Sequence, residues 1–409
     1  MTLTPTAGAV DPTGRVDPSR VTPENPEPGL VDALALVALY ADEVLVGTAR
    51  DTHRALASRA FTVARRTTMG AATVPQVVHD AVATGIYSSI SLTLRTAASA
   101  LAAVGATGIG PRLDDSPHGR VLHSAVNGLI GDRLREEHPH LALAMTVRVD
   151  GRIVPMSTAA LADAFPDATE RVVVFLHGLG EHEGHWNSRA QERGGTYASR
   201  LRAEAGWTPV HLRMNTGLAV AENGVALTSL MRELIASWPT EVRRVALVGH
   251  SMGGLVIRAA CAVATDEEAP WTDLVTDVVT LGTPHLGADL ALGVSHGARL
   301  LGLLPEIAAF GTVLDHRSPG IRDLERGLPE LPPLPHVRYR LVSAALGDER
   351  SIWGRLIGDL LVRRGSATGT LRRAVRLFPD AELLHVPNAD HFSLLNHADV
   401  ATALARWLA

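Results

Sequence analysis

The stretch that decides the fold is residues 245–254, Val-Ala-Leu-Val-Gly-His-Ser-Met-Gly-Gly. Its first four residues form an apolar run typical of a buried strand, and the apolar residues after Gly254 favour a helix. Between them lies G-x-S-x-G, which predicts a sharp strand-to-helix turn that exposes Ser251 as a nucleophile. Such a turn strains the serine backbone and admits only small residues two positions away on either side, a demand that Gly249 and Gly253 meet.

A second glycine motif, H-G-L-G at residues 177–180, directly follows another apolar run. A strand that ends in H-G-x-G turns sharply, so the Leu179 amide is free to point at the same position as the amide of Met252. We expect these two N–H groups to form an oxyanion hole, in which one donor is worth about 3 kcal/mol. Gly178 and His250 flank this position and are candidate substrate-binding residues. The alternative is an ordinary glycine turn.

Strands and helical patterns alternate from about residue 141 to the end. Asp150-Gly151 predicts a tight hairpin between two short strands. Helical patterns such as Gly224–Trp238 separate the later strands. This alternation predicts an α/β fold with a mostly parallel sheet flanked by helices, which binds ligands at the carboxyl ends of its strands. The later strands are expected at Arg171–Leu176, Thr208–Arg213, Val242–Val248, Leu274–Leu281, Val337–Ser343 and Glu382–Val386.

The general base should be a histidine after the last strand, because folds with this elbow order their triad as serine, acid, histidine. We assign His391, which lies on the loop after that strand. His385 falls within the strand, and His397 falls at the start of the final helix. The acid should follow the strand at 337–343, where both Asp348 and Asp359 qualify. Proximity to the strand slightly favours Asp348.

From about Glu170 onward the chain resembles the α/β-hydrolase superfamily. It looks most like the bacterial lipase and esterase branch related to the GPI-inositol-deacylase (PGAP1-like) group. In that branch a G-D-G-L-V-P-x-x-S-A segment holds the triad acid, and residues 358–367 match it except at Leu360 and Arg363. The resemblance therefore moves the assignment of the acid to Asp359. The motifs that carry the resemblance are H-G-L-G at 177–180, N-T-G at 215–217, N-G at 223–224, G-H-S-M-G-G at 249–254 and L-G-T-P-H-L-G at 281–287.

The resemblance implies a serine hydrolase of the lipase or esterase type. It would cleave carboxylic esters through an acyl-enzyme, with Ser251, Asp359 and His391 as the triad. An acyltransferase or a thioesterase would use the same triad. A catalytically weak lipid-surface adaptor is the alternative from another class of protein.

We expect neither a cofactor nor a metal. The segment E-H-E-G-H at 181–185 places two histidines three residues apart in a glycine-rich loop. The zincin motif needs a spacing of four on a helix, so that both imidazoles share one face. This loop is instead expected to border the substrate entrance.

Composition divides the chain into three parts: a Pro-rich disordered tail at 1–29, a helical region at 30–138 and an α/β-hydrolase domain at 139–409. A helical insertion is expected at about 287–335, either as a lid or as packed core. As a lid, its apolar residues would favour substrates with apolar acyl chains. The triad and oxyanion residues all lie beyond position 170, so the helical region is expected to serve solubility or localisation. Within it, one helical face is formed by Val121, Leu122, Ala125, Val126, Leu129, Ile130 and Leu134.

Charge and hydropathy limit the partners. The net charge of −5 predicts no nucleic-acid partner. The apolar stretch Ile86–Val104 is interrupted by Arg95 and many small polar residues, which argues against a membrane span. Because residues 30–47 are almost continuously apolar, they need a covering surface, either the hydrolase domain or a lipid surface. We therefore expect a cytoplasmic protein with a small-molecule or lipid ester substrate, and with residues 30–138 as the region for any peripheral lipid contact.

Overall fold

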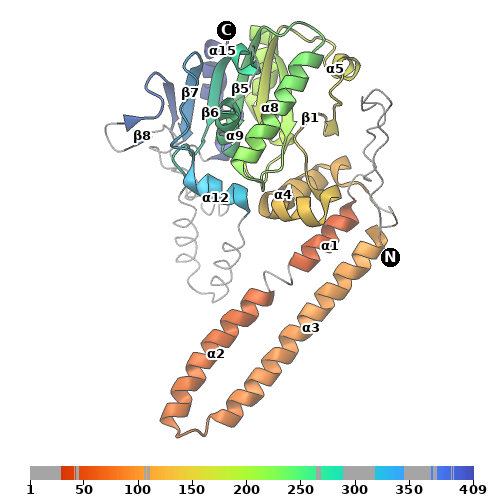
Figure 1. Cartoon of the computed structure of the whole chain (residues 1–409), viewed down its shortest axis with the longest axis vertical. Helices are drawn as coiled ribbons and strands as arrows, with labels where there is room; N and C mark the ends of the chain where they lie inside the picture. The colour runs from red at the N-terminus through yellow and green to blue at the C-terminus, as the bar shows by residue number, and fades with distance from the viewer. Residues whose placement is uncertain are drawn as a thin grey trace, which may run out of the picture.

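Apolar runs of the chain become neighbouring strands of one eight-stranded sheet in the computed structural model (Figure 1). The strand order is β10-β7-β6-β5-β3-β4-β1-β2. Neighbours from β10 to β4 run parallel, whereas β1 is antiparallel to both β4 and β2. The bounds are β1 Thr146–Val149, β2 Arg152–Ile153, β3 Arg171–Leu176, β4 Thr208–Arg213, β5 Arg244–His250, β6 Val275–Leu281, β7 Arg338–Ala344 and β10 Glu382–Val386. A separate antiparallel pair is formed by β8 Thr370–Leu371 and β9 Val375–Arg376.

The structure describes residues 29–40, 42, 46–105, 107, 111–263, 269–288, 318–344, 370–371, 375–387, 389 and 391–409. Residues 1–28 of the expected tail lie outside these ranges. So do most of the expected lid, at 289–317, and both candidate acids, Asp348 and Asp359.

The predicted α/β architecture is confirmed. The bounds of β3, β4 and β10 are those expected from the sequence, and β5, β6 and β7 shift only slightly. The hairpin between β1 and β2 turns at Asp150 and Gly151, which have φ angles of 51° and 83°. Both residues thus adopt the positive φ that a two-residue hairpin turn of this type requires.

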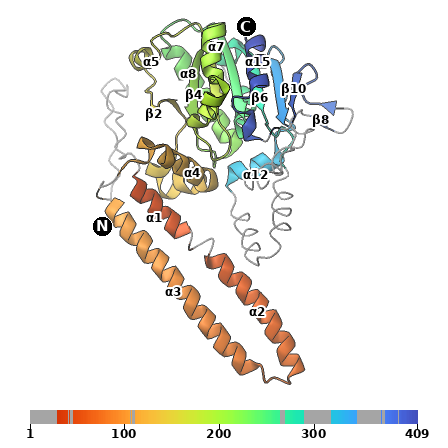
Figure 2. The same ribbon diagram turned by 180° about the vertical axis from the view of Figure 1, so that it is seen from behind.

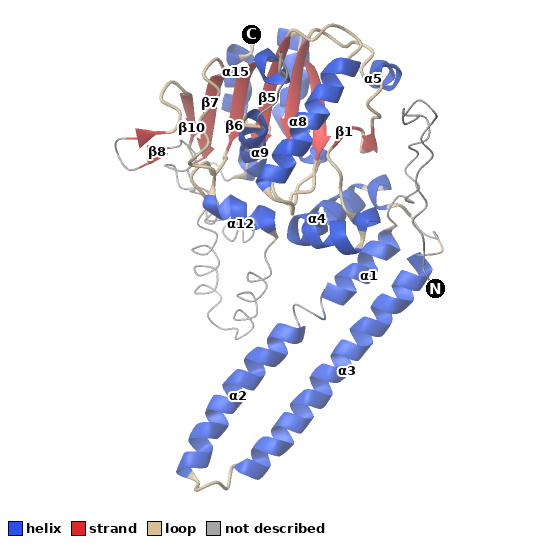
Figure 3. Ribbon diagram, viewed as in Figure 1, coloured by secondary structure: helices blue, strands red, loops and turns tan. Residues whose placement is uncertain are grey.

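Helices cover both faces of the sheet (Figure 3). Successive residues of β3 point into opposite apolar layers, with Val172 and Val174 in one layer and Val173 and Phe175 in the other. The first layer is covered by α8 Val220–Ser237 and α9 Met252–Cys261, and the second by α7 Tyr197–Ala205 and α15 Ala398–Trp407 (Figure 2). Two short helices, α5 Thr158–Ala164 and α6 Ala190–Arg193, lie in the connections.

Helix α4, Pro117–Glu137, packs beside the carboxyl edge of the sheet through its small residues. A Cβ added at Gly128 would lie 3.1 Å from the backbone of Gly180, and one at Gly131 would lie 1.8 Å from the Asn215 side chain. Helix α12, Pro319–Arg326, joins this contact, because Ser318 donates a 2.8 Å hydrogen bond from its hydroxyl to the Gly128 carbonyl.

The expected apolar face of α4 is only partly buried. Leu134 is fully buried and Leu122, Val126 and Ile130 pack against the same cluster, whereas Val121 and Leu129 are 46% and 55% exposed. The more deeply buried side carries His123, Asn127 and small residues. The reason is that this helix packs on loop backbone, which demands close approach and hydrogen-bonding groups. Asn127, for example, accepts the Leu143 amide at 2.8 Å.

Three further helices precede α4: α1 Leu30–Tyr40, α2 Gly47–Thr67 and α3 Thr73–Gly105. Helix α1 packs against α3 and α4, and buries Ala33 and Leu36 in a cluster with residues of the α4 region. Helices α2 and α3 form a hairpin that projects away from the sheet (Figures 1 and 2). Within the described ranges, no helix is both long and apolar enough to cross a membrane.

Candidate active site

Ser251 occupies the turn between β5 and α9 with φ 51° and ψ −121°. Residues with side chains rarely hold such a conformation, and it persists only where the surroundings enforce it. The neighbouring glycines permit the turn. A Cβ at Gly249 would lie 2.5 Å from the Gly254 nitrogen, and one at Gly253 would lie 2.5 Å from the Leu176 oxygen. The strained turn and the need for small flanking residues, both inferred from the sequence, are therefore present.

Two hydrogen bonds fasten this turn to the end of β6. The Ser251 amide donates to the Leu281 carbonyl at 2.8 Å. The Thr283 hydroxyl donates to the Ser251 carbonyl at 2.9 Å. The L-G-T-P-H-L-G segment therefore holds the turn at Ser251 in place through Leu281 and Thr283.

The imidazole of His391 fills the space that Gly282 leaves open. A Cβ at Gly282 would lie 2.9 Å from both Cε1 and Nδ1 of that ring, which is buried. Since Leu281 and Thr283 bind Ser251 directly, the same three-residue segment brings Ser251 and His391 together at the carboxyl edge.

The other two candidate histidines have local partners. His385 lies in β10, with Nδ1 3.1 Å from the Ser343 hydroxyl. His397 precedes α15, and its Nδ1 accepts the Asp399 amide at 3.2 Å. Neither contact places the imidazole beside the serine turn.

The H-G-L-G turn lies against the serine. A Cβ at Gly178 would lie 2.9 Å from the Ser251 Cβ. The Gly180 amide donates to the Thr216 hydroxyl at 3.0 Å, which ties the turn to the N-T-G segment. Within the part of the chain that the structure describes, the amides of Leu179 and Met252 donate no hydrogen bond.

Glu181 and His250 form a buried pair beneath these loops. Nδ1 of His250 lies 3.0 Å from the Glu181 carboxylate, which also accepts the Gly178 amide at 2.8 Å. Nε2 of His250 lies 3.2 Å from the His391 carbonyl oxygen, and the two imidazole centroids are 4.6 Å apart. The pair therefore connects the H-G-L-G turn, the turn at Ser251 and the loop that carries His391.

The two side chains shift each other's pKa in opposite directions. Burial raises the pKa of Glu181, but the charge and hydrogen bond of His250 outweigh it and lower that pKa to about 2. Burial lowers the pKa of His250, but the Glu181 charge and hydrogen bond, with the bond to the His391 carbonyl, raise it above its usual value. A protonated His250 can donate from both ring nitrogens, which suits its two acceptors.

His177 is neutral and structural. Burial lowers its pKa to about 4. Its Nδ1 donates to the Gly178 carbonyl at 2.9 Å, and its Nε2 accepts the Met214 amide at 3.1 Å. His177 therefore connects the end of β4 to the start of the H-G-L-G turn.

The sequence led us to expect the segment 181–185 at the substrate entrance, and the structure shows that its first three side chains are buried. Glu183 accepts two 2.6 Å hydrogen bonds from the Arg213 guanidinium, and His182 accepts the Gly184 amide at 3.0 Å. These partners hold the loop inward. Over the described ranges, no group of three or more His, Cys, Asp or Glu side chains is arranged to hold a metal ion.

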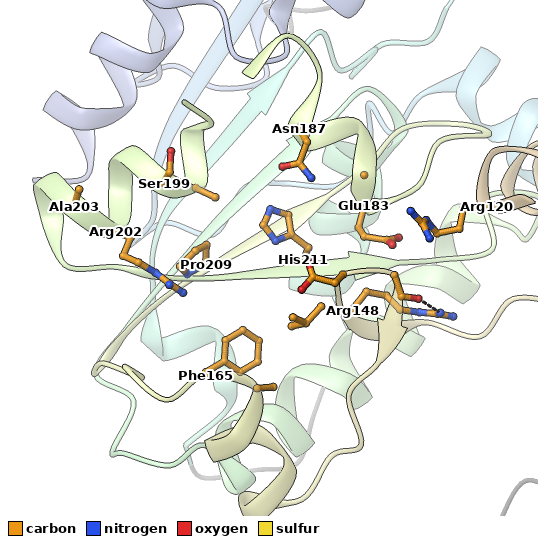
Figure 4. A pocket seen from close by; sticks show the side chains of 16 residues that line it. Arg120, Arg148, Phe165, Glu183, Asn187, Ser199, Arg202, Ala203, Pro209 and His211 are labelled. Carbon is orange, nitrogen blue, oxygen red and sulfur yellow. Dashed lines mark hydrogen bonds between the residues drawn. The ribbon is translucent and has the colours of Figure 1, made fainter. Parts of the chain in front are cut away.

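A cavity of about 800 Å³ lies away from the serine turn, between β1, β4 and α7. Figure 4 shows His211 near its middle, with Arg120 and Arg202 on different sides. Its lining includes Glu183 and Gly184 but neither Ser251 nor His391. Burial lowers the pKa of His211 to about 4, so the central imidazole is neutral.

Sequence reasoning had noted His250 but missed its partner Glu181, and it used Gly282 only as part of a motif. The sequence signal that could have identified Glu181 is its position directly after H-G-L-G. If H-G-L-G and G-H-S-M-G-G lie side by side in the fold, this carboxylate is buried next to them. Of the expected site residues, Gly178, Leu179, His250, Ser251, Met252 and His391 lie in the described ranges, and Asp359 lies outside them.

The strand order, the strained turn at Ser251 and the H-G-L-G turn beside it are those of an α/β-hydrolase fold. Comparison with known proteins agrees, and residues 167–298 match the family described as the PGAP1-like alpha/beta domain. The chain is thus similar to that family over its central third, as its motifs predicted.

A triacylglycerol lipase of Burkholderia plantarii is 28% identical over 155 residues, which are 37% of this chain and 40% of that protein. The match therefore spans about two fifths of that relative. The mature lipase BlEst2 of Bacillus licheniformis is 20% identical, with a TM-score of 0.39, over 58% of this chain and 91% of that chain. The esterase PF2001 of Pyrococcus furiosus is 15% identical, with a TM-score of 0.40, over 59% of this chain and 84% of that chain.

Proposed function

We propose that the protein is a serine hydrolase that cleaves carboxylic esters through an acyl-enzyme intermediate. The observation that carries the proposal is the strained turn at Ser251, with the His391 imidazole held against Gly282 beside it. A strained serine at a strand-to-helix turn is the geometry that exposes a nucleophile. A buried histidine next to it supplies a general base.

In this mechanism His391 removes the Ser251 proton as the hydroxyl oxygen attacks the ester carbonyl. The amides of Leu179 and Met252 receive the negative charge of the tetrahedral intermediate. His391 then protonates the departing alcohol, and a water molecule attacks the acyl-enzyme in the same way. Asp359 is our candidate for the acid that orients His391 and stabilises its charged form.

Gly178 and the Glu181–His250 pair have supporting parts in this proposal. Gly178 lets the H-G-L-G turn approach Ser251 closely, because a side chain at this position would collide with the serine. Both ring nitrogens of His250 have partners within the protein, so we assign it a positioning role and not direct contact with substrate. By its hydrogen bonds to the Gly178 amide and the His391 carbonyl, the pair fixes the H-G-L-G turn and the His391 loop relative to each other.

The substrate class follows from chemistry and composition. The apolar residues between Leu290 and Phe310 would suit an apolar acyl chain.

A panel of p-nitrophenyl esters of graded chain length tests the proposed ester hydrolysis and its preference for apolar acyl chains. We expect kcat/KM to rise from short to medium chains and to vanish in Ser251→Ala. Hydrolysis that is absent for every chain length, with a folded protein, would contradict the proposal. Added alcohol that diverts the acyl group from water would instead identify an acyltransferase.

A further inference from the structure

The end of the α2–α3 hairpin, residues 55–79, is an apolar and cationic surface on an acidic protein. We call it the hairpin tip. It contains three arginines and no carboxylate, although the whole chain carries a net charge of −5. The arginines share the tip with exposed apolar side chains, which are Leu56, Val63, Met69, Val74, Val77 and Val78.

The exposed apolar side chains lie on both helices of the tip and on the turn between them. Leu56, Arg59, Val63 and Arg66 fall at helical spacings that place them on one side of α2. Val74, Val77 and Val78 share one side of α3 by the same spacing rule. Contacts between the helices use other positions, such as the tilted packing of Phe61 on His79 with centroids 5.3 Å apart. The exposed apolar groups are therefore additional to those that hold the hairpin together.

Met69 lies at the far end of the turn. It is 98% exposed and has a φ of 50°, a conformation that is uncommon for a residue with a long side chain. The turn is closed by backbone hydrogen bonds from Thr68 to Ala64 and from Gly70 to Arg65. These bonds fix the backbone of the turn that carries the exposed Met69 side chain, and this turn joins α2 and α3 at the end of the hairpin away from the sheet (Figures 1 and 2).

We propose that the hairpin tip docks on a phospholipid bilayer that carries anionic headgroups, with Met69 and the neighbouring valines entering the interfacial layer. A bilayer surrounds an inserted tip, so it can cover exposed apolar groups on both helices and on the turn at once, whereas a protein groove covers one side. Arginines next to the apolar groups complement anionic headgroups. A second copy of the chain fits less well, because facing tips would bring like charges together.

The test is flotation of the full-length protein with vesicles of phosphatidylcholine, alone or mixed with phosphatidylglycerol. We expect binding to the mixed vesicles that weakens with salt. The triple variant Arg59→Gln, Arg65→Gln, Arg66→Gln should weaken binding by on the order of 100-fold, since each cation near an anionic surface contributes roughly a fivefold factor. Met69→Ser with Val74→Ser should also weaken it.

The matched control is Val225→Ser with Arg243→Gln, which alters an exposed valine and an exposed arginine on the sheet domain. This variant should bind as wild type does. Turnover of a soluble p-nitrophenyl ester should be unchanged in every tip variant, so vesicle binding is scored independently of the proposed hydrolase activity.

Three results would overturn the proposal. The first is no binding to mixed vesicles. The second is equal binding by the tip variants and wild type. The third is a dimer in solution that dissociates in the Met69→Ser, Val74→Ser variant, which would make the tip a contact between copies.

Discussion

Glu181→Gln tests the role of the buried pair in positioning the catalytic loops. Glutamine keeps the shape and one acceptor oxygen but removes the charge opposite His250. The carboxylate accepts two hydrogen bonds, from the Gly178 amide and from His250 Nδ1. Bonds to a charged acceptor are roughly twice as strong as neutral ones, and a neutral bond is worth about 1 kcal/mol. The substitution should therefore lower the free energy of unfolding by about 2 kcal/mol.

Activity should fall as well, because the Gly178 turn contacts the Ser251 side chain and His250 holds the His391 carbonyl. A displacement of about 1 Å at such a site can cost about 100-fold in rate. We expect kcat on a soluble ester to fall by about 10- to 100-fold, with KM nearly unchanged. Stopped or continuous assays with p-nitrophenyl butyrate measure both constants.

The matched control is Glu183→Gln, two residues away on the same loop. Glu183 is also buried and paired, but its partner is Arg213. This variant should lose comparable stability in urea unfolding and keep kcat near wild type. Equal losses of kcat in the two variants would refute the positioning role. So would a Glu181→Gln enzyme with wild-type kcat.

The pair also predicts a pH dependence of stability. The pKa of His250 is raised on folding, so its contribution is full below its ordinary value of 6.5 and is lost as pH rises through the raised value. The pKa of Glu181 is lowered, so its contribution is full above 4.5 and is lost as pH falls toward about 2. The difference in free energy of unfolding between wild type and Glu181→Gln should therefore be largest between pH 4.5 and pH 6.5. It should decrease as the pH rises through the raised pKa of His250. A gap that widens with rising pH would contradict this sign.

Five further substitutions test the base, the acid and Gly282. His391→Ala should abolish turnover while His397→Ala retains it, as steady-state assays would show, and the opposite ranking would move the base to His397. Asp359→Asn should reduce kcat by about 10⁴-fold, the loss expected when the wrong histidine tautomer is stabilised, while Asp348→Asn stays near wild type. The reverse ranking of these two would make Asp348 the acid. Gly282→Ala places a methyl group 2.9 Å from the His391 ring, so kcat should drop by about 100-fold with a modest fall in melting temperature. Unchanged kcat would mean that Gly282 does not position the ring.

Local patterns in the sequence predicted the sheet and much of the candidate site. The run Val172–Leu176 is apolar at every position because both faces of β3 are buried, and this continuity defines its bounds. Gly249 and Gly253 predicted a strained serine turn because only small residues fit beside it. His391 was recognised by its position after the last strand.

Features that depend on long-range contacts were not predictable in this way. Glu181 and His250 are 69 residues apart, and no local pattern reports their pairing. The buried side of α4 was only partly predicted, because Val121 and Leu129 of its apolar face are exposed while Asn127 and Gly128 meet loop backbone. The hairpin tip was likewise not apparent, since propensity predicts helices but not that two of them project away from the sheet.

The central claim is that Ser251 is the nucleophile, and covalent labelling tests it most directly. The full-length protein is treated with a fluorophosphonate, and the intact mass is measured alongside Ser251→Ala, with circular dichroism to confirm that both are folded. We predict one adduct on the wild-type protein, located at Ser251 by peptide mapping, and no adduct on the variant. An adduct that persists on folded Ser251→Ala, or a wild-type protein that stays unlabelled, would contradict the account.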